Sequence, residues 1–377
     1  GEVAQRLGLS TQVWCNPTGM IISFAERGPV DDRLSELTQV LRLAPGENDL
    51  RRLSIVDRIA EDVGDGKLGI ADGYRQLRQL DRPPRWGSRL LRALAHGVSA
   101  GAIAVLFGLS GADVGVSAVN GLAIGLLGLL AARNAHFAAG YEAMAALMVA
   151  LFTAWYSAQV GPLEVNTVLV ASLIVLLPGM MLTTAVNELA VQHLVAGMSR
   201  FAGASAVLLK LVFGTAAGLE IATVLGFPQQ VAQAQALSEP WAWLAVAVAS
   251  LNFALLFKAD WRDYPLVMAS AAAGFAVARL LGFNYGAEFA AFGAGLFVGV
   301  LSNVFARISN RPGAIVRVPG IIMLVPGSTG FRSLFLAIQG EVSQGLDVAF
   351  ALLLLLIALV AGLLFANVLV TPRRSLS

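Results

Sequence analysis

This 377-residue chain contains apolar runs of two different lengths, separated by polar residues. Up to about residue 86 the apolar runs are short, whereas from Ser88 onward long apolar segments are separated by short polar connections. The ten long segments are 88–108, 112–132, 141–160, 166–187, 200–226, 241–257, 264–282, 287–305, 318–338 and 346–370. Most can cross about 30 Å of hydrocarbon as helices rising about 1.5 Å per residue. The pattern predicts an α-helical polytopic membrane protein with about ten transmembrane helices.

The first 86 residues mix short apolar runs with charges, which predicts a small α/β domain. Its predicted elements are strands at Gly19–Phe24 and 37–43 and helices at 49–63 and around Ile70, Tyr74 and Leu77. The first helix ends at Gly64, and Asp57, Glu61 and Asp62 are predicted to form a solvated face on it. A domain of this size has a modest core, so we expect it to lean on another part of the chain as a cytoplasmic gate or assembly element.

Composition supports the membrane interpretation. The chain is 57% hydrophobic and only 13% charged, whereas a soluble domain carries about a quarter charged residues. Buried helices of a large soluble protein are excluded by the number of apolar segments and by their lack of polar faces. The single cysteine, Cys15, cannot form an internal disulfide. Because the chain starts at Gly1, a preceding targeting segment stays an open question.

Lys and Arg residues occupy every second connection between the apolar segments. They are Arg82, Arg85, Arg89 and Arg92, then Arg133, then Arg200, then Lys258 and Arg262, then Arg307, Arg311 and Arg317, then Arg373 and Arg374. The intervening connections contain Asp or Glu but neither Lys nor Arg. Because Lys and Arg gather in cytoplasmic connections, the alternation predicts ten crossings with both termini and the α/β domain in the cytoplasm. Residues 258–263 are then inside and residues 228–239 outside.

Two apolar segments contain the same break. The stretches "LIVLLPGMMLTTA" and "IIMLVPGSTGFRS" both place Pro-Gly after an aliphatic run, at an offset of 148 residues (326 − 178). Each lies in the fourth segment of a set of five, and because five is odd the second set runs in the inverted direction. Inverted repeats around broken helices are typical of secondary transporters, although a simple proline kink would explain either copy alone. We therefore divide the chain into the cytoplasmic α/β domain 1–86 and two five-helix modules, 87–227 and 228–377.

A helix that restarts after Pro-Gly presents free N–H groups and a partial positive charge. Two such ends meeting near the midplane could hold the carboxylate of a small metabolite. The predicted substrate-binding residues are Pro178, Gly179, Thr183, Thr184, Asn187, Pro326, Gly327, Ser328, Thr329 and Arg332. No His pair has metal-ligand spacing, so neither a metal site nor another cofactor is expected.

Charged residues near these breaks are candidates for proton coupling, namely Glu188, Lys210 and His193. Thr184, Glu188 and Gln192 are spaced by four and are predicted to share one helix face, where a partly desolvated carboxylate could exchange protons. The alternative is that Glu188 is solvated and paired with Arg200. Lys210 is predicted near the midplane, or else it snorkels or pairs with Glu188 or Glu220.

Three stretches carry a resemblance to a known family. "NPTGMIISF", "LLPGMMLTTAVNELAVQHLVAGMSRFAGA" and "VPGIIMLVPGSTGF" resemble the threonine/serine exporter family in its fused two-module form. The resemblance implies an antiporter of the bacterial inner membrane that exports threonine and serine with the proton motive force. The acidic position of the family signature falls on Glu188, where Asp is expected, and its Gly and Arg fall on Gly197 and Arg200.

Several functions stay open beside a secondary exporter of small hydrophilic amino acids. Related split systems are linked to dicarboxylate export, so C4 dicarboxylates such as succinate are the main alternative substrates. A passive channel and a membrane-anchored hydrolase are weaker alternatives; residues 1–86 contain no His to serve as a base, and we expect no enzyme. The expected partners are the substrate, protons and the lipid bilayer, but no nucleic acid, and a homo-oligomer is left open.

Overall fold

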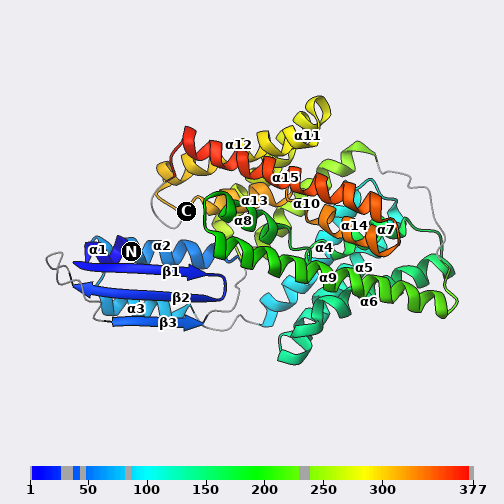
Figure 1. The fold of residues 1–377 in the computed structure, drawn as a ribbon, viewed down its shortest axis with the longest axis horizontal. Coiled ribbons are helices and arrows are strands. Elements are labelled where there is room, and N and C mark those ends of the chain that lie inside the picture. The colour runs from blue at the N-terminus through cyan, green and yellow to red at the C-terminus, as the bar shows by residue number, and fades with distance from the viewer. Residues whose placement is uncertain (1, 27–36, 43–47, 81–85, 229–237, 373–377) are drawn as a thin grey trace.

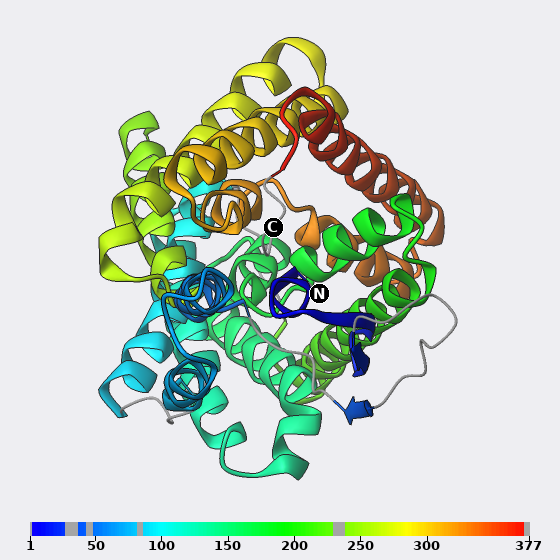
Figure 2. The same ribbon diagram turned by 90° about the vertical axis from the view of Figure 1, so that its left-hand side faces the viewer.

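The computed structural model describes residues 2–26, 37–42, 48–80, 86–228 and 238–372. It consists of a long body of helices with a small sheet and three short helices at one end (Figure 1). Seen from that end, the N-terminal region lies in front of the helical body (Figure 2). The protein is therefore a predominantly helical membrane protein with a small N-terminal region that contains strands.

The N-terminal region begins with α1 (Glu2–Arg6) and a three-stranded antiparallel sheet in the order β1-β2-β3. The strands are β1 (Leu9–Asn16), β2 (Gly19–Glu26) and β3 (Leu37–Arg42), followed by α2 (Leu50–Gly64) and α3 (Ile70–Gln79). The predicted strands and helices are present, whereas α1 and β1 were not predicted. The β1–β2 hairpin is tight because Asn16 pairs with Gly19, and the Asn16 side chain accepts a hydrogen bond from Thr18 N at 3.0 Å.

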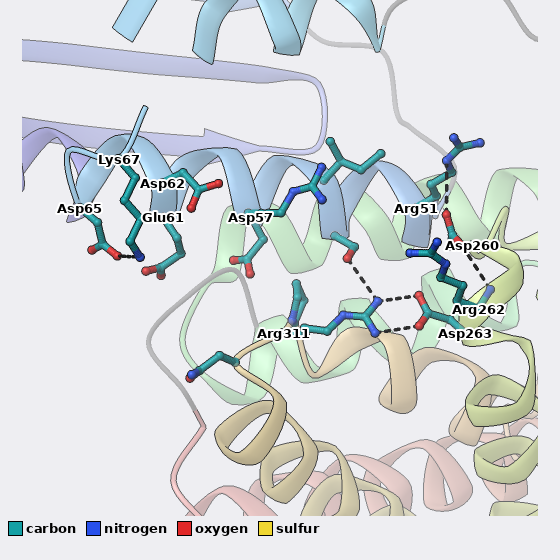
Figure 3. Close-up of a pocket in the computed structure, with 15 residues that line it drawn as sticks. Arg51, Asp57, Glu61, Asp62, Asp65, Lys67, Asp260, Arg262, Asp263 and Arg311 are labelled. Carbon is teal, nitrogen blue, oxygen red and sulfur yellow. Dashed lines mark hydrogen bonds and ion pairs between the residues drawn. The ribbon is translucent and has the colours of Figure 1, made fainter. Parts of the chain in front are cut away.

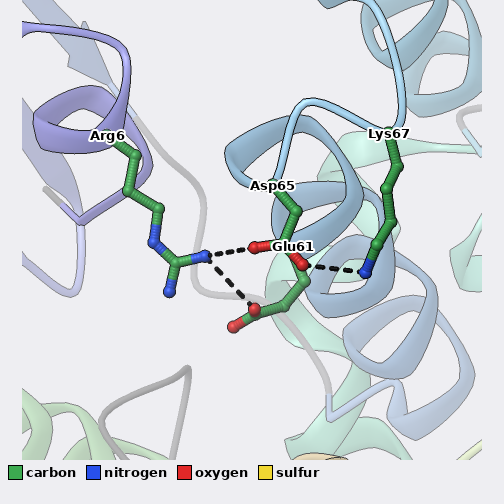
Figure 4. Close-up of polar contacts among 4 residues, drawn as sticks. All are labelled: Arg6, Glu61, Asp65 and Lys67. Carbon is green, nitrogen blue, oxygen red and sulfur yellow. Dashed lines mark hydrogen bonds and ion pairs between the residues drawn. The ribbon is translucent and has the colours of Figure 1, made fainter.

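Surface ion pairs hold α1 against the end of α2 (Figure 4). Arg6 Nη1 lies 3.0 Å from Asp65 Oδ1 and 3.4 Å from Glu61 Oε2, and Lys67 Nζ lies 2.9 Å from Asp65 Oδ2. The hydrogen bond from Lys67 lowers the pKa of Asp65, and the same contact raises the pKa of Lys67. Because these groups are at the surface, the ion pairs orient α1 without adding much to stability.

Each of the ten predicted apolar segments corresponds to one helix or to one broken pair of helices. They are α4 (Trp86–Leu106), α5 (Gly111–Ala131), α6 (Ala135–Gln159), α7 (Val165–Leu173) with α8 (Gly179–Ala190), α9 (Leu194–Val224), α10 (Glu239–Leu256), α11 (Tyr264–Tyr285), α12 (Ala287–Ser309), α13 (Ala314–Ile322) with α14 (Gly327–Ile338), and α15 (Val342–Leu369). Within the described ranges, nine helical stretches are long and apolar enough to cross a membrane. The α7–α8 pair is not among them, although the similarly divided α13–α14 pair is, so the number of ten crossings stays a prediction.

Two helices begin six residues earlier than the apolar pattern predicts. Helix α6 begins at Ala135 rather than 141, and α9 begins at Leu194 rather than 200. In α6 the early start has a local cause, because the Asn134 side chain accepts a hydrogen bond from His136 N at 2.9 Å and caps the helix. The additional residues, AHFAAG in α6 and LVAGMS in α9, are mostly small or apolar, so the sequence analysis started both helices too late.

Glycines bring the third and fifth helices of each half into close contact. A Cβ atom on Gly214 of α9 would lie 2.2 Å from Ala143 O of α6, and a Cβ atom on Gly295 of α12 would lie 2.7 Å from Leu359 O of α15. Each of these glycines has a second glycine four residues later, at Gly218 and Gly299. Small residues at this spacing allow helix backbones to approach closely in membranes, so the two halves use the same packing device.

Other helix contacts also recur between the two halves. Helix α8 packs on α9 as α14 packs on α15, and α9 contacts α14 as α15 contacts α8. The first helices of the two halves, α4 and α10, contact each other. This pattern supports the predicted five-plus-five repeat, while its inversion across a membrane stays a prediction.

The N-terminal region docks on the second half of the body. Leu50 N donates a hydrogen bond to Phe257 O at 3.0 Å, and Arg51 N donates one to Lys258 O at 3.3 Å. These bonds join the N-terminal N–H groups of α2 to carbonyls at the end of α10, and the Leu50 side chain is only 3% exposed. The connection 258–263 therefore lies on the same side of the body as the N-terminal region, as predicted. Most of the connection 228–239, which is predicted to lie outside, falls outside the described residues.

Candidate functional site

The two Pro-Gly breaks have the same backbone geometry. Pro178 has φ −81° and ψ 40°, and Pro326 has φ −83° and ψ 46°. In each copy the glycine N donates to the carbonyl two residues earlier at 2.9 Å, and the helix then resumes with a bond back to the proline carbonyl. The first N–H groups of α8 and α14 have no acceptor within their own helix. Each break thus creates a new helix N-terminus inside the body.

These two N-termini meet each other. A Cβ atom on Gly179 would lie 2.3 Å from Val325 Cγ1 and 3.2 Å from Gly327 Cα. A Cβ atom on Gly327 would lie 3.0 Å from Gly179 Cα. A Cβ atom would overlap Val325 at Gly179 and would be tight against the backbone of Gly179 at Gly327. The close approach brings the partial positive charges of two helix ends together.

A cavity of about 860 Å³ opens beside this junction. Its lining comes from α4, α5, α6, α10, α11 and both breaks. Four of the predicted substrate-binding residues line it, namely Pro178, Gly179, Gly327 and Ser328. The cavity is large enough for a small metabolite, so the breaks and the cavity together form the candidate substrate site.

The charged part of the cavity wall comes from α4. Arg89, Arg92 and His96 line the cavity, and their spacing of three and four places them on one helix face. His96 Nδ1 lies 2.7 Å from Arg92 O, and because a carbonyl only accepts, Nδ1 carries the proton. Sequence analysis used these arginines only for orientation. The available signal was polar residues at helical spacing in an otherwise apolar segment.

The other predicted substrate-binding residues lie around the junction rather than on the cavity wall. Pro326 and Thr183 are buried, Thr184, Asn187 and Thr329 are partly buried, and Arg332 is exposed. Within the described part of the chain, Thr183 Oγ1 is buried without a hydrogen-bond partner. In contrast, Thr184 Oγ1 donates to Met180 O at 2.8 Å. Substrate binding by these residues stays a prediction.

Glu188 forms an ion pair beyond the junction. Arg200 Nε donates to both carboxylate oxygens of Glu188, at 2.8 and 3.0 Å, and the two side chains are 37% and 17% exposed respectively. This is the pairing that the alternative interpretation of Glu188 expects. The predicted face of three residues was wrong at Gln192, because α8 ends at Ala190 and Gln192 adopts φ +66°. Proton coupling by Glu188 stays a prediction.

Lys210 pairs with a residue that sequence analysis did not consider. Its Nζ lies 3.4 Å from Glu142 Oε2 and 3.3 Å from Ala139 O, both on α6. The alternative interpretation offered Glu188 or Glu220 as the partner, but the close α6–α9 packing places Glu142 within reach. His193, the third coupling candidate, is exposed just before α9.

A second, polar cleft of about 560 Å³ separates α2 from the connections that follow α10 and α12 (Figure 3). Arg311 donates to both oxygens of Asp263, at 2.8 and 2.6 Å, and lies 3.4 Å from Ser54 Oγ of α2. The hydrogen bonds with Asp263 raise the pKa of Arg311. Asp57 is only 4% exposed, so the predicted solvated face was wrong there, because α2 docks on the body. The cleft is a junction between the N-terminal region and the second half.

Acidic residues and histidines are scattered rather than clustered. Within the described ranges, no three His, Cys, Asp or Glu side chains come close enough to hold a metal ion. The polar groups around the breaks are N–H donors, hydroxyls and guanidinium groups, which bind anions rather than cations. The arrangement therefore fits an anionic or zwitterionic ligand.

Comparisons with known proteins agree with this geometry. Residues 1–222 match a family model for threonine/serine exporters, and residues 242–369 match the model described as "Threonine/Serine exporter, ThrE". The first match alone covers more than half of the chain, and the two together confirm the fused two-module form. No solved structure matches the chain.

Curated relatives come from yeasts. The pheromone-regulated membrane protein 10 of Candida albicans is 28% identical over 336 residues, which are 84% of this chain and 29% of the relative. The protein of that name from Saccharomyces cerevisiae is 26% identical over 334 residues, 85% of this chain and 42% of the relative. An uncharacterized protein of Schizosaccharomyces pombe is 28% identical over 320 residues, which are 80% of this chain and 37% of the relative. The chain thus spans less than half the length of these relatives.

The fold, the paired breaks and the family matches lead to one assignment. The protein is a multi-pass membrane protein, and its family is one of exporters rather than of enzymes. The chain belongs to the threonine/serine exporter family.

Proposed function

We propose that the chain is a secondary active exporter of small hydrophilic amino acids, such as threonine and serine, driven by the proton motive force. The observation that carries the proposal is the meeting of two helix N-termini at Gly179 and Gly327 beside a cavity of about 860 Å³. An amino acid has a carboxylate that such a junction can bind, and it is small enough for the cavity.

The physical argument rests on charge. Two helix N-termini with like partial charges repel each other unless an anion lies between or beside them. The unsatisfied N–H groups of the first turns of α8 and α14, together with the Ser328 hydroxyl, supply donors for a carboxylate. Of the predicted substrate-binding residues, those on the cavity wall contact the substrate first, and Thr183, Thr184, Asn187, Thr329 and Arg332 contribute as the helices move.

Transport requires the two five-helix modules, 87–227 and 228–377, to move against each other around this junction. The α/β domain 1–86 acts as a cytoplasmic gate or assembly element, and its contacts with α10 and α12 support that role. The protein uses no cofactor, and we assign it to the cytoplasmic membrane of a bacterium with both termini inside. That assignment rests on the charge alternation and on the resemblance of the sequence motifs, because the curated relatives are from yeasts.

C4 dicarboxylates are the second candidate substrates. Arg89 and Arg92 on the cavity wall favour them, because a second carboxylate could pair with a guanidinium group while the first is held at the junction. An amino acid carries an ammonium group instead, which these arginines repel. The two substrate classes therefore differ in the charge at their second end.

Efflux from preloaded proteoliposomes tests the proposal. Threonine, serine, other small neutral amino acids and C4 dicarboxylates are compared with and without an imposed pH gradient. We expect amino acid efflux that rises with the gradient and falls to the passive level when an uncoupler is added. Efflux that is insensitive to uncouplers would instead identify a passive pore, and efflux of dicarboxylates alone would identify the second candidate.

A further inference from the structure

We propose that the N-terminal region is a latch across the two halves of the body: it stays docked on the second half and releases the first half when the junction of the two breaks opens. The inference rests on the proposed export function and assigns the contact that separates in each transport cycle. It follows from a difference between two interfaces, because the N-terminal region contacts both halves but is held firmly by only one.

The contact with the second half is firm. Leu50 is buried in a cluster with Val267 of α11, and Val318 of α13 packs against that cluster. The N–H groups of Leu50 and Arg51 donate hydrogen bonds to carbonyls at the end of α10, at 3.0 and 3.3 Å. Buried apolar contacts and backbone hydrogen bonds therefore hold α2 to three helices of the second half. One of these helices, α13, leads into the second break.

The contact with the first half is loose. Strand β1 contacts α9 at the end of the body where α9 begins (Figure 1). Within the described part of the chain, no hydrogen bond or ion pair joins β1 to α9. Leu194, Val195 and Met198 in the first two turns of α9 are more than half exposed, and so is Trp14 of β1. An interface that buries so little opens more easily than the one formed by α2.

The start of α9 moves together with α8. A Cβ atom on Gly197 would lie 3.0 Å from Ala185 O, so the two helix backbones are in close contact there. Arg200 adds two hydrogen bonds to Glu188, at 2.8 and 3.0 Å. We call this unit, residues 185–200, the α8–α9 corner. Because α8 begins at the first break, a movement of that break relative to the second half displaces the α8–α9 corner relative to β1.

The N-terminal region also moves as one unit. Helix α1 contacts both β1 and α2, and Arg6 of α1 pairs with Glu61 of α2 at 3.4 Å (Figure 4). In the proposed cycle the two modules move against each other around the junction. A unit that is attached to α13 and rests on the α8–α9 corner cannot keep both contacts during that movement. The looser contact, between β1 and α9, is the one that opens.

The substrate cavity gives a further reason for α2 to stay in place. Asn48, two residues before α2, lines the cavity of about 860 Å³. The next residue, Asp49, caps α2 by accepting a hydrogen bond from Arg52 N at 2.9 Å. Docking of α2 therefore fixes part of the cavity wall, whereas β1 and α9 are not among the described residues that line the cavity. Release of β1 leaves that wall intact.

The single cysteine of the chain makes the latch testable. Cys15 is exposed on β1, and Met198→Cys places one partner on α9. The purified variant is treated in detergent with a short bifunctional methanethiosulfonate reagent and is then reconstituted. We expect serine exchange between equal pools to fall to the level of liposomes without protein, and to return when a reductant cleaves the bridge. The same variant treated with a monofunctional methanethiosulfonate should keep its exchange, which separates bridging from modification.

The matched control places the same bridge across the firm contact. Arg51 Nε lies 3.8 Å from Asp260 Oδ2, so Arg51→Cys and Asp260→Cys are combined with Cys15→Ser. We expect this bridge to leave serine exchange unchanged, because α2 stays on the second half throughout the cycle.

Three results would overturn the latch. Normal exchange in the bridged β1–α9 pair would show that this contact does not have to open. Loss of exchange in the control pair would show that the N-terminal region leaves the second half. If Cys15 forms a bridge in none of the variants Leu194→Cys, Val195→Cys and Met198→Cys, β1 does not lie on α9 as the latch requires.

A distance measurement does not depend on transport. Spin labels are attached to the same two cysteine pairs in protein reconstituted into lipid nanodiscs, and electron–electron distances are measured. We expect two distances for the β1–α9 pair, one latched and one released, and one distance for the α2 pair. A single distance for both pairs contradicts the latch even if the protein exchanges serine. Two distances for the β1–α9 pair in a protein that exchanges neither serine nor a dicarboxylate would support the latch while the export function fails.

Discussion

The two halves of the membrane body share a scaffold but differ in what they add to it. Both breaks have the same proline dihedrals and the same glycine contact. The first half adds the charged wall of the cavity, with Arg92 and His96 on α4, whereas the described lining residues of the second half, such as Phe253 and Phe275, carry no charge. The second half also supplies carbonyls, those of Phe257 and Lys258, that accept hydrogen bonds from the start of α2.

This difference suggests that the two repeated halves have different roles. The shared junction of the two breaks is suited to the part common to all substrates of the class, the carboxylate. The charged wall of the cavity comes from the first half, whereas the contacts with the start of α2 come from the second half. We therefore expect matched changes at the junction to have equal effects, and changes elsewhere to affect one half only.

The largest effect is expected from filling the junction. Gly179→Val and Gly327→Val each place side-chain atoms where a Cβ alone would lie 3.0 Å or less from the opposite break, so we expect both variants to lose substrate exchange, by about 100-fold or more. Gly115→Val in α5 is the control, because a Cβ at Gly115 meets nothing within 4 Å. Serine exchange and size-exclusion profiles in detergent separate loss of transport from loss of folding. Loss in only one of the two junction variants would break the equivalence of the halves.

The junction was also the part of the site that the sequence could predict. Two copies of Pro-Gly in matching segments are visible without a structure, because the break is local and the repeat fixes its place. The positions of the long helices follow from hydropathy for the same reason. The meeting of the two helix ends was expected. The contribution of α4 side chains to the cavity wall was not, since that depends on how α4 packs.

Features that depend on tertiary packing were missed. Asp57 was expected at a solvated face, but it is buried because Leu50 and α2 dock on the end of α10. The partner of Lys210 was not predicted, because Glu142 reaches it only through the glycine contacts between α6 and α9. Gln192 does not lie on the predicted helix face, because it follows the end of α8 and adopts a left-handed backbone conformation. No local signal such as a glycine marks that turn.

An intermediate effect, on how firmly α2 is held against the second half, is expected from the Arg311–Asp263 ion pair. Arg311→Gln removes the guanidinium group that holds Asp263, whose side chain is 7% exposed. Breaking a fully buried pair costs about 3–5 kcal/mol, and because Arg311 is 37% exposed we expect about 1–3 kcal/mol. Hydrogen exchange of the α2 amides should become roughly ten- to a hundredfold faster.

Arg51→Gln is the matched control for that change. Arg51 Nε lies 3.8 Å from Asp260 Oδ2, and the side chains are 65% and 35% exposed, so this pair contributes less than about 1 kcal/mol. If serine exchange is normal in Arg311→Gln while α2 exchanges hydrogen faster, the N-terminal region is an assembly element. If serine exchange changes as well, it acts as a gate. Equal protection of α2 in both variants and in wild type would show that the ion pair does not hold the N-terminal region.

The smallest effect, on thermal stability and serine binding, is expected from a change one turn beyond the breaks, where α8 and α14 differ in sequence. Thr183 of α8 has a buried hydroxyl with no hydrogen-bond partner among the described residues, whereas the matching position in α14 is Phe331, stacked on Phe335. An unpartnered buried hydroxyl costs about 1–3 kcal/mol, so Thr183→Val should leave thermal stability unchanged or higher. If the hydroxyl serves the substrate in another state of the cycle, the half-saturating serine concentration should rise by about two- to tenfold. The control is Thr215→Val, at a buried position of α9 where the hydroxyl donates to Leu211 O at 2.9 Å. This variant should change neither quantity, and an equal response of both variants would assign the effect to helix packing in the first half.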